Sequence, residues 1–122
     1  KGNSGEKLVQ RLEQRLDNMT YRLGFASTLR QARQMVVHGH ILVNGKKVDR
    51  PSYKVEVEDT ISLKEKSKSI AIFKDSFTST TTNLPYLEKN LNDFSGKLIA
   101  EPKRDQVPIE VTDSYIIEFY SK

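Results

Sequence analysis

The chain has no cysteine, and this absence excludes a disulfide framework and catalysis by a thiolate. Only two histidines are present, His38 and His40, so a zinc site has no evident third ligand. Tryptophan is also absent, and apolar runs such as residues 41–43 are far shorter than the ~20 residues of a membrane-spanning helix. We therefore expect a soluble protein from a reducing, cytoplasmic setting, with no membrane partner, no metal and no cofactor.

Positive charge is distributed unevenly along the 122 residues. Residues 1–68 contain 14 Lys and Arg against 8 Asp and Glu, a net charge of +6. Residues 69–122 contain 6 against 8, a net charge of −2. This asymmetry predicts a part that faces a polyanion, joined to a part with another role.

Hydrophobic spacing predicts two helices in the first 40 residues. Residues 3–6 (Asn-Ser-Gly-Glu) have the pattern of a capping box, and an apolar stripe with helical spacing follows at Leu8, Leu12, Leu16, Met19 and Leu23. We expect one helix from about residue 4 to residue 23, ended by Gly24. A second capping box at residues 28–31 predicts a helix that ends at Gly39 and forms a helical hairpin with the first.

After the helices the spacing changes to the alternation typical of strands. Strands are predicted at residues 40–43, 46–48, 53–57 and 61–63. Asn44-Gly45 is the strongest short signal for a hairpin turn, because a type I′ turn needs positive φ at both central residues. A second turn is predicted at Glu58-Asp59.

The remaining residues give weaker signals. Ile70, Phe73 and Phe77 predict a short helix, and the later elements are a polar loop at 78–82 and strands at 97–100 and 116–120. The fold class we expect is α+β: a helical hairpin packed on a small bent antiparallel sheet, followed by a smaller mixed helix and strand segment.

Arginine recurs beside the apolar stripe of both predicted helices. The polar and basic side chains that we expect on this face are Arg11, Arg15, Asn18, Arg22, Arg30, Arg33 and Gln34. Arginine binds phosphate through two parallel charge-assisted hydrogen bonds, whereas lysine acts as a point charge. The same arginines could equally be solvated, or paired with Glu13 and Asp17. The helices alone leave both interpretations open.

More cations follow in the hairpin and after the last of these strands. The further candidates for nucleic-acid binding are Lys46, Lys47, Arg50, Lys64, Lys66 and Lys68, with His38, His40 and Tyr53 between them. Rings interleaved with cations suit an RNA surface, where unstacked bases and 2′-hydroxyls are contacted in addition to phosphates. Tyr53 could instead pack half into the core.

Several segments closely resemble the small-subunit ribosomal protein S-four family. They are LEQRLDN at residues 12–18, YRLGFA at 21–26, QARQ at 31–34, HGHI at 38–41, VNG at 43–45, PSY at 51–53, KEKS at 64–67 and IEFYSK at 117–122. The resemblance runs from about Gly2 to the last residue. Glu58 departs from it, because the family often has glycine there, so the geometry of this turn is expected to differ.

The resemblance implies an RNA-binding module at residues 1–68 and a C-terminal segment at 69–122 packed with the first helix. It implies binding of small-subunit ribosomal RNA as a structural and assembly component of the ribosome, with neighbouring small-subunit proteins as partners. An influence on translational accuracy and repression of the protein's own mRNA in some bacteria are implied as well. Family members normally have an additional N-terminal domain, so we expect this chain to be the C-terminal portion of such a protein.

Two alternatives use a similar module. It also occurs in pseudouridine synthases and in a heat-shock protein that binds stalled ribosomal subunits. Arg15-Leu16-Asp17 resembles the end of the Gly-Arg-Leu-Asp catalytic motif of the synthases, but Gln14 replaces the glycine and Asp17 falls inside the predicted helix. We therefore expect no enzyme, no catalytic residue and no small-molecule substrate.

Overall fold

This computed structural model describes residues 4–80 and 83–107 of the chain. These residues contain a five-stranded antiparallel sheet with the strand order β2-β1-β3-β5-β4. Its strands are β1 (Ile41–Val43), β2 (Lys46–Lys47), β3 (Thr60–Leu63), β4 (Leu87–Asn90) and β5 (Ser95–Leu98). The α-helices of these residues are α1 (Ser4–Glu13), α2 (Leu16–Arg22), α3 (Leu29–Val37) and α4 (Ala71–Ser79), with short 3-10 helices η1 (Glu65–Ser69) and η2 (Arg104–Gln106). The expected α+β fold is confirmed.

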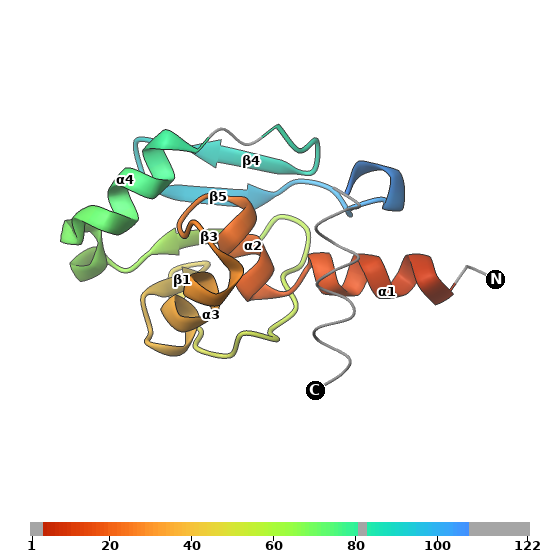
Figure 1. Ribbon diagram of the computed structural model, residues 1–122, viewed down its shortest axis with the longest axis horizontal. Coiled ribbons are helices and arrows are strands. Elements are labelled where there is room, and N and C mark those ends of the chain that lie inside the picture. The colour runs from red at the N-terminus through yellow and green to blue at the C-terminus, as the bar shows by residue number, and fades with distance from the viewer. Residues whose placement is uncertain (1–3, 81–82, 108–122) are drawn as a thin grey trace.

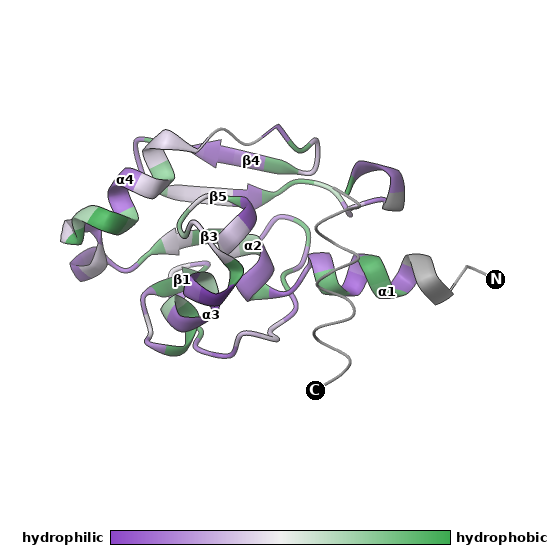
Figure 2. Cartoon of the chain, in the orientation of Figure 1, coloured by the Kyte–Doolittle hydropathy of each residue, from purple (hydrophilic) through white to green (hydrophobic). Residues whose placement is uncertain are grey.

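Helices α2 and α3 pack against each other and lie over the sheet, with α4 at one end of this arrangement and α1 extending from the other (Figure 1). Each of α1, α2 and α3 carries both hydrophobic and hydrophilic residues, as expected of helices with one buried side (Figure 2). The packing is tight at Gly96 of β5, where an added Cβ atom would collide with the side chain of Leu23. Among the described residues, no helix has the length and apolar composition needed to cross a membrane.

The predicted single helix over residues 4–23 is wrong, because the chain is interrupted at Gln14 and Arg15. Arg15 has an extended backbone (φ −67°, ψ 145°) and forms an isolated antiparallel bridge with Lys54. The amide of Val55 donates to the carbonyl of Gln14 (2.8 Å), and the side-chain amide of Gln14 donates to the carbonyl of Val55 (2.9 Å). The apolar residues keep helical spacing on both sides of the interruption, so their periodicity does not reveal it.

The same contact explains why the predicted strand at residues 53–57 is absent. The backbone of this segment pairs with Arg15 at Lys54, outside the sheet, and β1 pairs directly with β3. The predicted turn after it is present, and Glu58 adopts a positive φ of 81°, a conformation that favours glycine.

Local start and stop signals in this region are confirmed. The hydroxyl of Thr28 accepts a hydrogen bond from the amide of Gln31 (3.0 Å) at the start of α3. Gly39 has φ +80° directly after this helix and its cap residue, and Gly24 has φ +92° after α2. Asn44 and Gly45 both have positive φ, 52° and 83°, as a type I′ turn requires.

The C-terminal part is only partly as predicted. Helix α4 is confirmed, although it extends to Ser79 into the expected loop, and β5 lies at residues 95–98 where residues 97–100 were expected. Strand β4 was not predicted. Because β5 pairs with β3, one sheet contains strands from both sides of Lys68. Helix α1 begins at Ser4, as expected, whereas residue 3 of the expected capping box and the expected strand at 116–120 lie outside the described residues.

A buried carboxylate stabilises the chain at the interruption between α1 and α2. Glu13, at the end of α1, is 2% exposed, and its carboxylate accepts hydrogen bonds from Nε (2.7 Å) and Nη2 (3.2 Å) of Arg22. It also accepts one from the hydroxyl of Tyr86 (2.6 Å), while the side-chain amide of Asn18 donates to the Glu13 carbonyl (2.8 Å). We call these four residues the Glu13 cluster. Burial and the nearby Glu13 carboxylate raise the pKa of Tyr86, so its phenol stays protonated and can donate.

Replacement of Arg22 by alanine is expected to lower the free energy of unfolding by about 3–5 kcal/mol, because the Glu13 charge would be left buried without its cation. Urea denaturation followed by circular dichroism measures this. The matched control is Arg33→Ala, which removes an exposed arginine of α3 and should change stability by only about 0.5 kcal/mol. Equal, small losses in both variants would contradict the structural role of Arg22.

Candidate nucleic-acid interface

The outward side of α3 is a continuous polar and basic stripe. Its buried side is formed by Ala32, Met35 and Val36, and the exposed positions at helical spacing are Arg30, Arg33, Gln34, Val37 and His38. Neither Arg30 nor Arg33 forms an ion pair with any residue that the structure describes. The guanidinium groups of α3 are therefore available to a ligand.

The β1–β2 hairpin adjoins the C-terminal end of this stripe. Lys46 and Lys47 are exposed, and Cδ of Lys47 lies 3.2 Å from where a Cβ on Gly39 would be, so its stem crosses the end of α3. Asn44 braces the hairpin: its side chain donates to Asp59 (2.9 Å) and accepts from the amide of Thr60 (2.9 Å). We call this surface the basic face; it consists of Arg30, Arg33, Gln34, His38, Lys46 and Lys47.

Arg50 and Tyr53 form a second small group on the loop after the hairpin. The guanidinium carbon of Arg50 lies 5.8 Å from the centroid of the half-buried Tyr53 ring. The loop is tied to the start of α2, because the amide of Leu16 donates to the carbonyl of Tyr53 (2.9 Å). An arginine beside an aromatic ring is an arrangement on which an unpaired base can stack.

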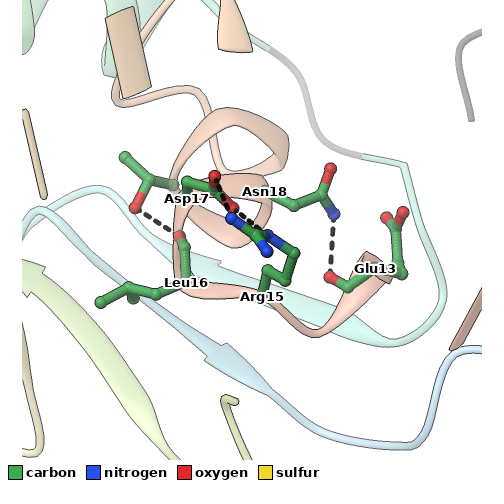
Figure 3. Close-up of polar contacts among 6 residues, drawn as sticks. Glu13, Arg15, Leu16, Asp17 and Asn18 are labelled. Carbon is green, nitrogen blue, oxygen red and sulfur yellow. Dashed lines mark hydrogen bonds and ion pairs between the residues drawn. The ribbon is translucent and has the colours of Figure 1, made fainter. Parts of the chain in front are cut away.

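Arg15 is engaged within the protein. Its guanidinium forms two hydrogen bonds of 3.1 Å with the carboxylate of Asp17, and the Arg15 side chain is 20% exposed (Figure 3). Asp17 is fully buried, so residues 15–17, which resemble a synthase motif, form an ion pair inside the protein.

Asn18 and Arg22 lie inside the Glu13 cluster. The Arg22 side chain is 7% exposed, and Figure 3 shows the Asn18 amide directed at the carbonyl of Glu13. Arg11, by contrast, is exposed on α1. Of the four candidates on the first predicted helix, Arg11 is thus an exposed cation before the interruption. The other three, Arg15, Asn18 and Arg22, bond within the protein.

His40 lies directly before β1 and contacts the lysine-rich segment that follows β3. Its Nδ1 lies 2.7 Å from the hydroxyl oxygen of Ser67, and its ring meets Phe73 edge-on at 4.9 Å between centroids. Burial lowers the pKa of His40, and the charges of His38 and Lys64 lower it further, so the ring is neutral near pH 7. Lys64 and Lys66 are exposed, whereas Lys68 pairs with Glu65 at 3.3 Å.

Two cations outside this region, Lys89 and Lys97, are held by other groups. Lys89 donates to the carbonyl of Thr80 (2.6 Å) and lies over the Phe77 ring, and Lys97 pairs with Glu58 (3.6 Å). A polar groove of about 740 Å³ beside β4 and β5 is lined by both Glu88 and Lys97, a mixture of charges that does not select for anions. No group of three potential metal-ligating side chains occurs within the described residues.

Two exposed residues on this side were not among the sequence candidates. Val37, 51% exposed, lies within the stripe of α3, and Lys54 faces Arg15 across the isolated bridge. The spacing of Val37 from Arg30 and Arg33 is a signal that would have placed it on the stripe. Lys54 had no such signal, because the segment was expected to be a strand of the sheet.

A family model matches this chain, and many known proteins are similar to it. The S4 domain matches residues 14–61, which include α2, α3 and the hairpin. The small ribosomal subunit protein uS4B of Clostridium acetobutylicum is 56% identical over 122 residues, covering 100% of this chain and 64% of that relative.

Two further relatives are similar over the whole chain. The uS4 protein of Clostridium beijerinckii is 50% identical over 123 residues, and that of Aquifex aeolicus is 51% identical over 126 residues. The chain covers 59% and 60% of these relatives, so it spans less than two thirds of their length. With an S4 domain at residues 14–61 and this identity along all of its residues, the chain is similar to the uS4 family of small ribosomal subunit proteins.

Proposed function

We propose that this chain binds small-subunit ribosomal RNA through the basic face, as a structural and assembly component of the small ribosomal subunit. The observation that carries the proposal is the stripe of α3, whose arginines are exposed and form no ion pair with a described residue, continued by the lysines of the hairpin. The chain's similarity to small ribosomal subunit proteins uS4 supports the proposal.

The binding mechanism follows from the chemistry of these side chains. The forked guanidinium groups of Arg30 and Arg33 match phosphate oxygens with two hydrogen bonds each, and Lys46 and Lys47 add point charges. Binding releases counterions condensed on the RNA, which supplies sequence-independent affinity. Arg50 and Tyr53 offer a stacking surface for an unpaired base, and Arg11, Lys64 and Lys66 extend the contact to phosphates further along the RNA.

The wider role that we propose rests on the family. In a cytoplasmic ribosome the chain would have neighbouring small-subunit proteins as partners and would influence the accuracy of translation. Binding of its own mRNA, by the same phosphate and base contacts, is part of the same proposal. No observation favours an RNA-modifying activity, since the aspartate that resembles a synthase residue is buried against Arg15.

Affinity for a small-subunit ribosomal RNA transcript is expected to fall steeply with salt. The logarithm of the binding constant should change with the logarithm of salt by about −0.7 to −0.9 per neutralised phosphate. The slope should be about −3 from the four cations of the basic face alone, and about −5 to −6 when Arg11, Lys64 and Lys66 also contact phosphates. Filter binding at several KCl concentrations measures the slope, and footprinting at two of them separates protection of one region from general polyanion affinity. An affinity that does not respond to salt would exclude phosphate anchoring.

Replacement of Arg33 by alanine is expected to weaken binding to this transcript about tenfold, because a charge-assisted pair of hydrogen bonds to phosphate is lost. Its melting temperature should stay within about two degrees of the unsubstituted chain, since the side chain is exposed. Lys74→Ala on α4 removes the same charge outside the basic face and serves as the control. Equal weakening in both variants would show that net charge, and not this surface, determines affinity.

A further inference from the structure

Helix α1 contacts the rest of the protein at its C-terminal end and also along its length, where the side chains of Val9 and Leu12 are buried. It extends away from the sheet and the α2–α3 pair (Figure 1), and along its length the side chain of Gln10 donates to the carbonyl of Pro102 (3.1 Å) beside η2. Helical hydrogen bonding stops at the interruption, where Arg15 is extended. The direction of α1 is therefore set by the contacts made at residues 13–15 together with those of Val9, Gln10 and Leu12.

The Glu13 cluster supplies three of these contacts from two other elements. Asn18 and Arg22 of α2 hold the carbonyl and the carboxylate of Glu13, and Tyr86, directly before β4, holds the carboxylate from the other side. Tyr86 is itself anchored, because its carbonyl accepts from the amide of Ile99 after β5 (2.8 Å). Glu13 and Tyr86 both lie outside residues 14–61, so the cluster joins the S4 domain to both flanking segments.

We propose that Tyr86, with Asn18 and Arg22, is a positioning residue for RNA binding: it fixes the direction of α1 and thereby the distance between Arg11 and the basic face. This inference rests on the proposed function. It assigns a role in RNA recognition to a residue of the C-terminal part that is fully buried and does not itself touch the ligand.

The geometry makes the position of Arg11 sensitive to this cluster. At 1.5 Å per residue along the helix, plus an extended side chain, the guanidinium of Arg11 reaches about 10 Å from the interruption. A tilt of about 20° at that point moves the guanidinium by about 3–4 Å, which is more than a hydrogen bond to a fixed phosphate tolerates. Arg33 on α3 would not move, because α3 packs on α2 beyond the interruption.

A double-mutant cycle on the affinity for the small-subunit ribosomal RNA transcript tests the proposal. Arg11→Ala is expected to weaken binding at least fivefold in the otherwise unchanged chain, and less than twofold when Tyr86→Phe is also present. Arg33→Ala should weaken binding by the same factor in both backgrounds. If Tyr86→Phe does not fold, Asn18→Ala replaces it in the same cycle, since it also frees Glu13.

The outcomes separate the two proposals. If Arg11→Ala weakens binding by the same factor with and without Tyr86→Phe, the positioning role is overturned while the proposed function stands. If neither Arg11→Ala nor Arg33→Ala weakens binding in the unchanged chain, the proposed RNA surface fails and the positioning role fails with it. Loss of the effects of both arginines in the Tyr86→Phe background would indicate general unfolding and would also overturn the positioning role.

A spectroscopic measurement reports on α1 directly. The chain contains no cysteine, so Lys7→Cys on α1 and Ile72→Cys on α4, both exposed, give two unique sites for spin labels. The distribution of distances between the labels should be narrow in the parent chain and clearly broader with Tyr86→Phe, without RNA present. An unchanged distribution would mean that the cluster does not set the direction of α1.

Discussion

The buried charge of Glu13 is the constraint on which the arrangement of this protein depends. A carboxylate removed from water needs a cation and hydrogen-bond donors, and here they come from α2 and from the residue before β4. The hydrogen bonds of the Glu13 side chain therefore fix α1, α2 and the residue before β4 relative to one another. The interruption between α1 and α2 is held in one geometry by hydrogen bonds to its backbone. The Asn18 side chain donates to the carbonyl of Glu13, and the amide of Val55 donates to the carbonyl of Gln14.

The sequence predicts those elements whose causes are local. The cap at Thr28, the Asn44-Gly45 turn and the stop at Gly39 each depend on residues a few positions apart, and all three are present. The interruption at Gln14 and Arg15 depends on Val55 and on Tyr86, which no window around residue 14 contains. Apolar spacing was misleading there, since a helix that breaks and restarts without losing its buried side keeps the same pattern.

The candidate site also combines features with local causes and features that depend on residues far along the chain. By composition and spacing Arg15, Arg22 and Arg33 are equivalent, yet the structure pairs the first with Asp17 and the second with Glu13, and leaves the third exposed. The helical spacing of α3 alone identified its stripe, because one uninterrupted helix has one outward side. Which arginines of the preceding segment reach the surface depended on acidic partners and on a tyrosine far along the chain.

The contact between Glu13 and Tyr86 also orders events during synthesis. The two residues are 73 positions apart. In a nascent chain the Glu13 carboxylate therefore lacks its hydrogen bond from the Tyr86 hydroxyl until Tyr86 has been synthesised. The short-range contacts of α2, α3 and the hairpin need only the first half of the chain and can form earlier. The Glu13 cluster can thus be completed only after the α2–α3 pair that it adjoins has been synthesised.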